Sequence, residues 1–347
     1  MALLDSRVMR HPVVRLVAVL AFLAAALVPA TRAGAGAGAE FSLSVAVSPA
    51  LPLGAAAKAW SEALAASPSG AIAAKLHPGA TLARRDPSRE FLALRDGDAD
   101  LAVGSALAWS VQVPAFAVYA TPWIAPRPAD LVALVESGEL FAELARRADA
   151  SGVVLIHAAP LGHRALATVA KPVRSPADLA GLAIRATGGP LVVDALAALG
   201  ARPQAMSFAQ AQAALAAGAI DGQEGPPTSF AAARLPAAGY GQVLRWGAFG
   251  DAMLFAVRRA VWAAWTDDQR RAAVDTARNA ALAAAPLRAE DDALARLAAQ
   301  GMAELAPTAE GIEAFRSAAA SAREAWRAHV GVDLVDIAQR AVAALPR

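Results

Sequence analysis

One arginine stands at the end of a short apolar segment, where a charged side chain needs a chemical reason. Residues 181–189 read GLAIRATGG, so Arg185 ends an apolar run and two glycines follow it closely. A guanidinium presents a planar fork of donors that fits a carboxylate with two hydrogen bonds, which a lysine cannot do. From these residues alone two interpretations stay open: recognition of a carboxylate ligand, and a structural ion pair of Arg185 with Asp178 or Glu224.

Other kinds of site chemistry find little support in the sequence. The chain has no cysteine, and its five histidines are scattered without the spacing of a metal site. It contains no GxSxG motif and no pair of acids in a recognisable catalytic pattern. The GAGAGA run at 34–39 matches part of a dinucleotide-binding pattern, but no strand precedes it. We therefore expect no metal, no cofactor and no enzyme activity.

The first residues indicate export. Arg7, Arg10 and Arg15 precede fifteen uncharged residues at 16–30, and small residues follow. This order is typical of a secretory signal peptide, which we place at 1–33, with a flexible spacer at 34–40. An uncleaved membrane anchor is the alternative, but the run is shorter than the ~20 residues that span a bilayer.

Composition and charge fit a globular protein without a polyanionic partner. The 347 residues suggest two domains, and 57% of them are hydrophobic, with alanine in excess. Residues 1–33 carry four basic side chains and one acidic one, so the remainder is close to neutral. Because its basic residues form no patch or stripe, we expect no nucleic-acid binding. The uncharged stretch 101–126 contains three prolines, and we interpret it as two buried strands joined by a loop.

Strand and helix patterns alternate after residue 40, which predicts parallel βαβ units in two α/β modules. Ser175, Ser207 and Thr266 are the expected N-caps of three of the helices. Strands are expected at 41–47, 71–79, 99–105, 152–160, 163–169, 182–186 and 203–206, with another beginning at AIDG (219–222). Helices are expected at 53–66, 88–97, 129–148, 175–181, 190–200, 207–217, 267–300 and 309–329.

An ordered series of segments resembles one known family. The series is PADLAGLAIR (176–185), then ALGARP (198–203), then MSFAQAQAALAAGAIDGQE (206–224), with SREFLALRDGDADLAV (88–103) and the HPG turn (77–79) before it. These segments resemble the extracytoplasmic solute-binding subunit of tripartite ATP-independent periplasmic (TRAP) transporters, of the dicarboxylate-binding DctP type. The resemblance covers roughly residues 41–305.

The resemblance implies a fold and an arrangement of domains. It implies a type II-like periplasmic binding protein with two α/β lobes joined by hinge-connected crossing segments, a helical C-terminal region, and the ligand in the cleft between the lobes. On this basis we expect lobe I at 41–161 and 251–290, and lobe II at 162–250 and 291–347.

The resemblance also implies roles for particular residues. Arg185 stands where the family's IR motif binds the ligand carboxylate. Arg164 matches a second arginine at the cleft, which would contact the ligand or stabilise the first arginine, with a surface strand end as its alternative. Phe208 matches an aromatic that lines the pocket, with core packing as its alternative. His163 stands where an aromatic is common, and it would face the ligand or be simply packed. Gln223 belongs to the DGQE motif near the hinge, where Asp221 and Gly222 are expected to fix the turn.

Two departures from the family pattern bear on the ligand. Gly225 replaces an asparagine that hydrogen-bonds the ligand in the family, which removes a polar side chain and would enlarge the cleft. TPWIAP (121–126) replaces a PFLF-like segment, so Trp123, with Trp109 and Trp60, would supply a bulky apolar wall. Together they predict a ligand larger or less polar than a small dicarboxylate.

The function implied is that of a monomeric periplasmic receptor without catalysis. It would bind an organic acid through Arg185 and deliver it to membrane permease subunits of a TRAP transporter. A periplasmic ligand-sensing module on the same fold is the first alternative, and an exported two-domain α/β enzyme is the second.

Overall fold

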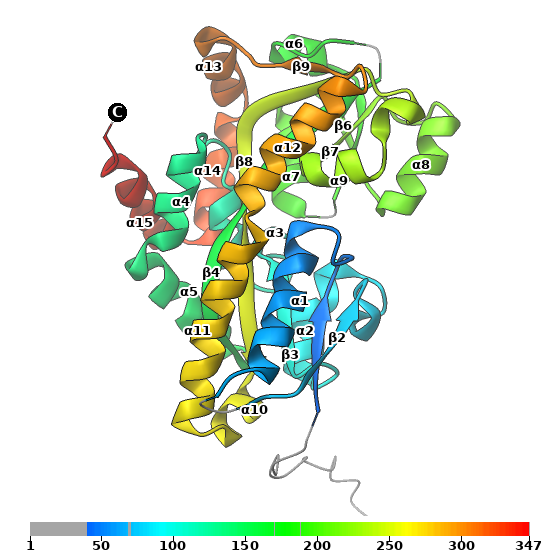
Figure 1. Cartoon of the computed structure of the whole chain (residues 1–347). Helices are drawn as coiled ribbons and strands as arrows, with labels where there is room; N and C mark the ends of the chain where they lie inside the picture. Colours follow the sequence, from blue (N-terminus) through cyan, green and yellow to red (C-terminus); the bar gives the residue numbers. More distant parts are fainter. Residues whose placement is uncertain (1–39, 69–70, 170, 188, 347) are drawn as a thin grey trace, which may run out of the picture. The chain divides into compact units, whose positions relative to one another are not determined.

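The strands of this chain pair in one mixed sheet, shown in the computed structural model of Figure 1. The structure describes residues 40–68, 71–169, 171–187 and 189–346, apart from the side chains of residues 208 and 209. In these residues nine strands pair in the order β2-β1-β3-β8-β4-β7-β5-β6, and β9 pairs with β8. The predicted signal peptide and all but the last residue of the predicted spacer lie outside the described residues.

The first α/β group is built on three parallel strands. β1 (Phe41–Val45) pairs with β2 (Ala74–Pro78) on one side and with β3 (Leu101–Ser105) on the other. Helix α1 (Pro52–Ala65) packs against these strands and against α11 (Asp267–Ala284). The connection from β2 to β3 contains the 3-10 turns η1 (Thr81–Ala83) and η2 (Pro87–Arg89) and helix α2 (Glu90–Asp96).

Two long antiparallel strands join this group to the second one (Figure 1). β8 (Gln242–Arg258) pairs with β3 through its C-terminal residues, and β4 (Val153–Thr168) pairs with β7 (Gly222–Gly225) through its own C-terminal residues. The β4–β8 pairing has three register shifts, one of them between Pro160 and Gly162. β4 and β8 are therefore the crossing segments between the two groups. The predicted two-lobe α/β fold is confirmed.

The second group repeats the parallel pattern. β5 (Ala183–Ala186) pairs in parallel with β6 (Arg202–Ala205) and with β7. Its helices are α6 (Pro176–Leu179), α7 (Pro190–Ala198), α8 (Phe208–Ala216) and α9 (Pro227–Ala232). The expected N-caps are confirmed, because Ser175, Ser207 and Thr266 each form a capping box at the start of α6, α8 and α11.

The remaining elements surround the sheet and end the chain. They are α3 (Ala106–Trp109), η3 (Pro114–Ala120), α4 (Pro128–Glu136), α5 (Gly138–Ala150), η4 (Leu235–Ala238), α10 (Arg259–Ala264), α12 (Pro286–Ala299), β9 (Ala303–Leu305), α13 (Ala309–Ala318), α14 (Ala320–Val330) and α15 (Val332–Ala343). Helix α14 packs against α7 and η3, and α15 packs against α4 and α5. The boundaries given for the two lobes stay a prediction.

Some predicted elements were wrong. The second strand expected within 101–126 is replaced by α3 and η3, because the Ser105 hydroxyl caps α3 and Pro114 fits the first turn of η3. The helix at 129–148 is split, since Ser137 has an extended backbone and caps α5. The segments 152–160 and 163–169 form one strand, β4. In the described residues, no helix is long and apolar enough to cross a bilayer.

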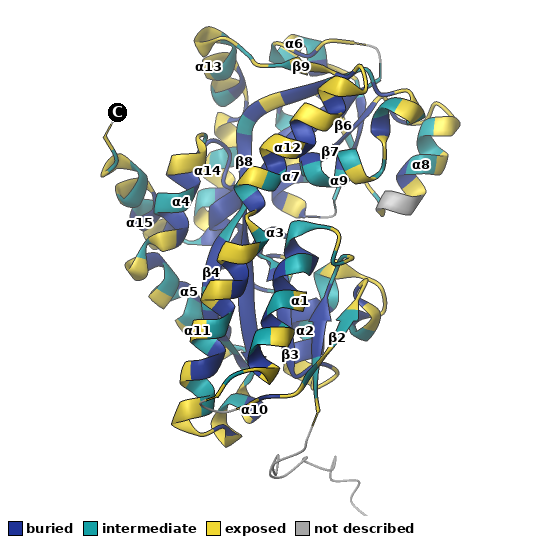
Figure 2. Ribbon diagram, viewed as in Figure 1, coloured by how far each residue is buried: buried dark blue, intermediate teal, exposed yellow. Residues whose placement is uncertain are grey.

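Buried apolar residues line both faces of the sheet, and alanine fills many of these positions (Figure 2). Trp60 lies in the core between α1 and the sheet, where its ring meets Phe255 edge to face and its N–H donates to the carbonyl of Ala273. Trp109 packs against Phe91 and Phe116. Trp60 and Trp109, which were expected to contribute to an apolar wall of the ligand site, therefore make contacts in the core.

Gly104 on β3 is a position where the packing leaves no room for a side chain. A Cβ atom there would lie 2.0 Å from the Trp109 ring. We expect Gly104→Ala to lower the free energy of unfolding by about 1–3 kcal/mol or more, because the indole has to move within a packed core. Urea unfolding of both proteins measures the change. Gly138→Ala is the matched control, since nothing lies within 4 Å of its Cβ position, and equal effects at the two positions would contradict this account of the packing.

Candidate functional site

Three neighbouring strands bring the predicted ligand residues together. Arg185 on β5 lies in register with Gln223 on β7, and Glu224 on β7 lies in register with Leu166 on β4. Arg164 precedes the residue of β4 that pairs with Gly225. The two arginines, about twenty residues apart in the sequence, thus lie on either side of β7.

Arg164 and Glu224 form a buried ion pair. The Nε atom of Arg164 donates to Oε2 of Glu224 at 2.6 Å, and its Nη2 atom donates to Oε1 at 2.9 Å. The same Nη2 donates to the hydroxyl of Thr187 at 2.9 Å, and the backbone N–H of Thr187 donates to Oε1 of Glu224 at 2.9 Å. The carboxylate therefore receives three donors and ties β4, β7 and the end of β5 together.

Arg185 is also buried, and two of its donors meet backbone carbonyls. Its Nε atom donates to the carbonyl of Met206 at 3.0 Å, and its Nη1 atom to that of Glu224 at 3.4 Å. The alternative ion-pair partner, Asp178, accepts instead from the backbone of Arg174 and from Ser175. The carboxylate of Glu224 is engaged by Arg164.

The pKa values of these groups reflect one carboxylate between two arginines. Burial opposes the charged form of Glu224, but the charge and hydrogen bonds of Arg164 outweigh it, so the pKa of Glu224 is lowered. Burial lowers the pKa of Arg185, and the nearby charge of Arg164 adds to this effect. Together these three side chains carry two positive charges and one negative charge, which favours an anion beside them.

Gln223 and Gly225 complete this part of β7. The side chain of Gln223 is fully buried, and its amide oxygen and nitrogen have no hydrogen-bond partner among the described residues. At Gly225 a Cβ atom would lie 3.0 Å from the ring of Phe230. The ring of Phe230 therefore takes up part of the space that the missing side chain leaves, and the cleft gains less room than the glycine alone suggests. Asp221 ties the residue before β7 to β5, because its Oδ2 atom accepts from the backbone N–H of Ala183.

His163 connects β4 to two other segments. Its Nε2 atom lies 2.8 Å from the carbonyl of Ala125, and its backbone N–H donates to Oε2 of Glu290 on α12 at 2.7 Å. The preceding residue, Gly162, has a φ of 121°, and a Cβ atom there would lie 2.4 Å from that same Oε2. Burial lowers the pKa of His163, so the ring is a neutral, packed side chain in these contacts.

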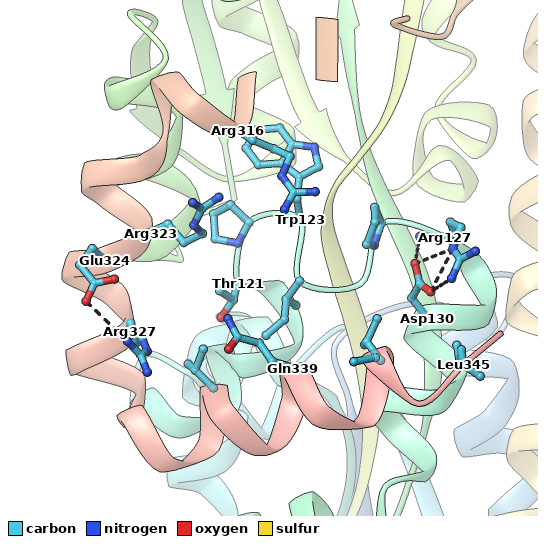
Figure 3. Close-up of a pocket in the computed structure, with 16 residues that line it drawn as sticks. Thr121, Trp123, Arg127, Asp130, Arg316, Arg323, Glu324, Arg327, Gln339 and Leu345 are labelled. Carbon is cyan, nitrogen blue, oxygen red and sulfur yellow. Dashed lines mark hydrogen bonds and ion pairs between the residues drawn. The ribbon is translucent and has the colours of Figure 1, made fainter. Parts of the chain in front are cut away.

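Trp123 lies in a different set of contacts. Its indole N–H donates to the carbonyl of Trp246 at 3.1 Å, and its ring stacks on Phe315 of α13. It also lines a cavity beside the C-terminal helices (Figure 3). The side chain of Phe208 lies outside the described part of the chain, so its predicted role stays a prediction.

Three neighbours of the arginines had no assigned role in the sequence. Thr187 bridges Arg164 and Glu224, and Phe230 covers Gly225. Tyr240 is buried near Arg185. Burial raises the pKa of Tyr240 to about 12, and the charge of Arg185 opposes this rise. Thr187 lies two residues after Arg185 of the IR motif, and this position was a usable signal. Phe230 and Tyr240 come from segments that carry no motif. No group of acids and histidines in the described residues is arranged to hold a metal ion.

The Arg164–Glu224 pair generates a prediction about stability. We expect Glu224→Gln to lower the free energy of unfolding by about 3 kcal/mol, because Arg164 then keeps a buried charge without a compensating one. Urea unfolding at pH 7 measures it, with Asp96→Asn in the exposed Arg95–Asp96 pair as the control that changes little. A double variant with Arg164→Met should lose less than the two single losses added together. Additive losses would show that the two side chains are not coupled.

Glu290 generates a prediction about pH. Burial raises the pKa of Glu290 to about 7 from 4.5, so between these values the folded protein holds a proton that the unfolded chain releases. Its contribution to stability is therefore fullest below pH 4.5 and is lost as the pH rises toward 7. We expect the stability of the wild type relative to Glu290→Gln to fall by about 3 kcal/mol across this window. Urea unfolding at several pH values tests this, and the exposed Glu62→Gln should show no such trend.

The chain is similar to solved structures of solute-binding proteins. A TRAP periplasmic solute-binding protein of Ralstonia eutropha H16, solved with bound (S)-2-acetolactate, is 35% identical, with a TM-score of 0.81 over 88% of this chain and 99% of that one. A TRAP periplasmic solute-binding protein of Sulfurospirillum deleyianum, solved with succinate, is 21% identical, with a TM-score of 0.75 over 86% and 98% of the two chains. At that identity the second likeness concerns the fold alone.

A curated relative and a family model also match the chain. The uncharacterized protein y4mM of Sinorhizobium fredii is 29% identical over 194 residues, which are 56% of this chain and 35% of that protein. The match thus spans about a third of the relative's length. The model of bacterial extracellular solute-binding proteins, family 7, named DctP, matches residues 43–328. This family consists of transport solute-binding proteins rather than enzymes, and the chain belongs to it.

Proposed function

We propose that this chain is the periplasmic receptor of a TRAP-type transporter, which binds a small organic acid between its two lobes and delivers it to membrane permease subunits. The observation that carries the proposal is the cluster of Arg164, Arg185 and Glu224 where β4, β7 and β5 meet. Two guanidinium groups and one carboxylate make this buried position electrically positive, which favours a carboxylate ligand.

Arg185 is the proposed ligand anchor, and Arg164 is its proposed support. Glu224 engages Arg164 through two hydrogen bonds, and this pair fixes the guanidinium of Arg164 in one orientation. The positive charge of Arg164 acts on Arg185 and helps to lower its pKa. A ligand carboxylate would reverse this effect, because an opposite charge close by favours the protonated guanidinium.

The proposed ligand is a small monocarboxylic acid with a hydroxyl or keto group, of the type of 2-acetolactate. The support is the likeness to the Ralstonia eutropha protein, which extends over almost the whole of both chains. Gly225 fits a ligand with one carboxylate, because it offers no polar side chain, and the adjacent Phe230 ring is apolar. The unpartnered amide of Gln223 is the proposed donor and acceptor for the ligand's hydroxyl or keto oxygen.

Export to the periplasm is part of the same proposal. Its support is the basic, apolar and small-residue order of the first 33 residues, together with membership of an extracellular family. The protein would act as a monomer and take its ligand from the periplasmic solution.

Binding assays with charged and neutral forms of one ligand test the proposal. We expect (S)-2-acetolactate to stabilise the wild type by about 2.7 kcal/mol at a hundred times its dissociation constant, measured by thermal unfolding. Its methyl ester should stabilise far less, because it lacks the charge that a guanidinium binds. Arg185→Ala should lose the effect of the acid, and Arg185→Lys should retain a small part of it.

The exposed Arg271→Ala on α11 is the matched control, and its response to the acid should equal that of the wild type. Equal stabilisation by acid and ester, or an undiminished effect in Arg185→Ala, would exclude Arg185 as the carboxylate anchor. Stabilisation by succinate and not by 2-acetolactate would keep a carboxylate receptor but reject the proposed ligand class.

A further inference from the structure

A cavity lies away from the arginine cluster of β4, β5 and β7, beside the C-terminal helices. It has a volume of about 860 Å³ and is lined by the segment 121–130 and by residues of α13, α14 and α15 (Figure 3). We call it the C-terminal pocket. Its size is within the usual range of small-molecule sites, and neither Arg164 nor Arg185 lines it.

Four arginines and two acids line the C-terminal pocket, and one acid is already neutralised. Asp130 accepts two side-chain donors and the backbone N–H of Arg127, in an arrangement that begins helix α4. In the view of Figure 3 this pair lies on the opposite side of the pocket from Arg323. The remaining lining charges are three arginines and Glu324. Arg327 lies 2.7 Å from Asp336 and 3.9 Å from Glu324, so the positive charge left without a close acid here is that of Arg323, beside the loosely paired Arg316.

Arg323 is the most available of these charges. It is half-buried, yet within the described residues its guanidinium has no acid within 4.0 Å. Arg316 is 3.7 Å from the exposed Glu313, which is a loose contact. Arg327 bonds to Asp336 at 2.7 Å, but its buried Nε atom has no partner among the described residues. Donors thus remain unused on one side of the pocket.

The other part of the lining is apolar. Pro122, Trp123 and Ile124 contribute from the first segment, and Val335 and Val342 contribute from α15. Trp123 is held rigidly, because its N–H bonds to Trp246 and its ring stacks on Phe315. A ligand that fits such a lining has an anionic group at one end and an apolar body at the other.

We propose that the C-terminal pocket is a second binding site, which takes an organic anion with a carboxylate on an apolar, ring-sized body. Arg323 and Arg316 hold the carboxylate, and the apolar body lies against the Trp123 segment and α15. This site is separate from the proposed ligand cleft and does not depend on the function proposed for it.

Calorimetric titration with 2-naphthoate tests the proposal, with neutral 2-naphthamide as the matched compound. We expect 2-naphthoate to bind the wild type and Arg185→Ala with the same affinity, and 2-naphthamide to bind at least fivefold more weakly. Arg323→Gln should weaken 2-naphthoate at least fivefold, and the double variant with Arg316→Gln should abolish binding. Arg323→Lys should retain most of the affinity for 2-naphthoate, because it keeps the positive charge. If Arg323→Gln weakened binding only by changing the shape of the side chain, Arg323→Lys would not retain that affinity.

Arg340→Gln is the control, because Arg340 lies on α15 and pairs with Glu139 but does not line the pocket. Its affinity for 2-naphthoate should equal that of the wild type. Three results would overturn the proposal: no binding to the wild type, unchanged binding in the double variant, or loss of binding in Arg185→Ala, which would place the compound in the other site. Unfolding temperatures of all variants confirm that each protein is folded.

Discussion

The arrangement of the candidate site depends on the ion pair between Arg164 and Glu224. Both side chains are almost completely buried, so each loses its hydration, and only close contact with good geometry offsets that cost. The geometry here satisfies the condition, since Glu224 receives two donors from Arg164 and one from the backbone of Thr187. The pair fixes the relative positions of β4, β7 and the residues after β5. Arg185 lies on the neighbouring strand β5, and its guanidinium donates to the backbone carbonyls of Met206 and Glu224.

The long strand β4 connects this pair to the rest of the molecule. Two residues before Arg164, the strand has a register shift and a glycine in the left-handed region. That conformation leaves room for the carboxylate of Glu290, which accepts from His163. A side chain at position 162 would occupy the place of this acceptor. The irregularity of β4 therefore joins this strand to α12. It lies just before Arg164, which β4 contributes to the site.

Arginine has two different settings in this protein. Arg164 and Arg185 are buried, and their donors meet a carboxylate or backbone carbonyls, so their positions are well determined. Arg316 and Arg323 are half-buried beside the C-terminal pocket, where water competes for the same donors. A charge in the first setting acts more strongly because the surroundings screen it less. In the second setting affinity depends more on the apolar surface of Trp123 and α15.

Much of the local structure followed from the sequence. Ser175, Ser207 and Thr266 were identifiable as caps, because a hydroxyl before a helix and a matching side chain three residues later satisfy backbone groups locally. Alternating strand and helix patterns indicated two α/β groups, and the ordered motifs identified the family. The apolar stretch after Ser105 was misassigned as a strand, since a short buried run has no distinct period and the capping of α3 decided it.

Contacts between distant residues needed the tertiary structure. Position 185 was recognisable as a candidate anchor from its motif, with Asp178 or Glu224 as its alternative ion-pair partner, and only the pairing of β4 with β7 showed that Glu224 pairs with Arg164. Gly225 read alone suggested open space, whereas the fold brings Phe230 against it. The place of Trp123 at the ligand stays a prediction, but its packing against Trp246 and Phe315, more than a hundred residues away in the sequence, was not foreseen. Sequence determines short-range hydrogen bonding and burial patterns, while the neighbours of a side chain are set by how the strands pair and the helices pack.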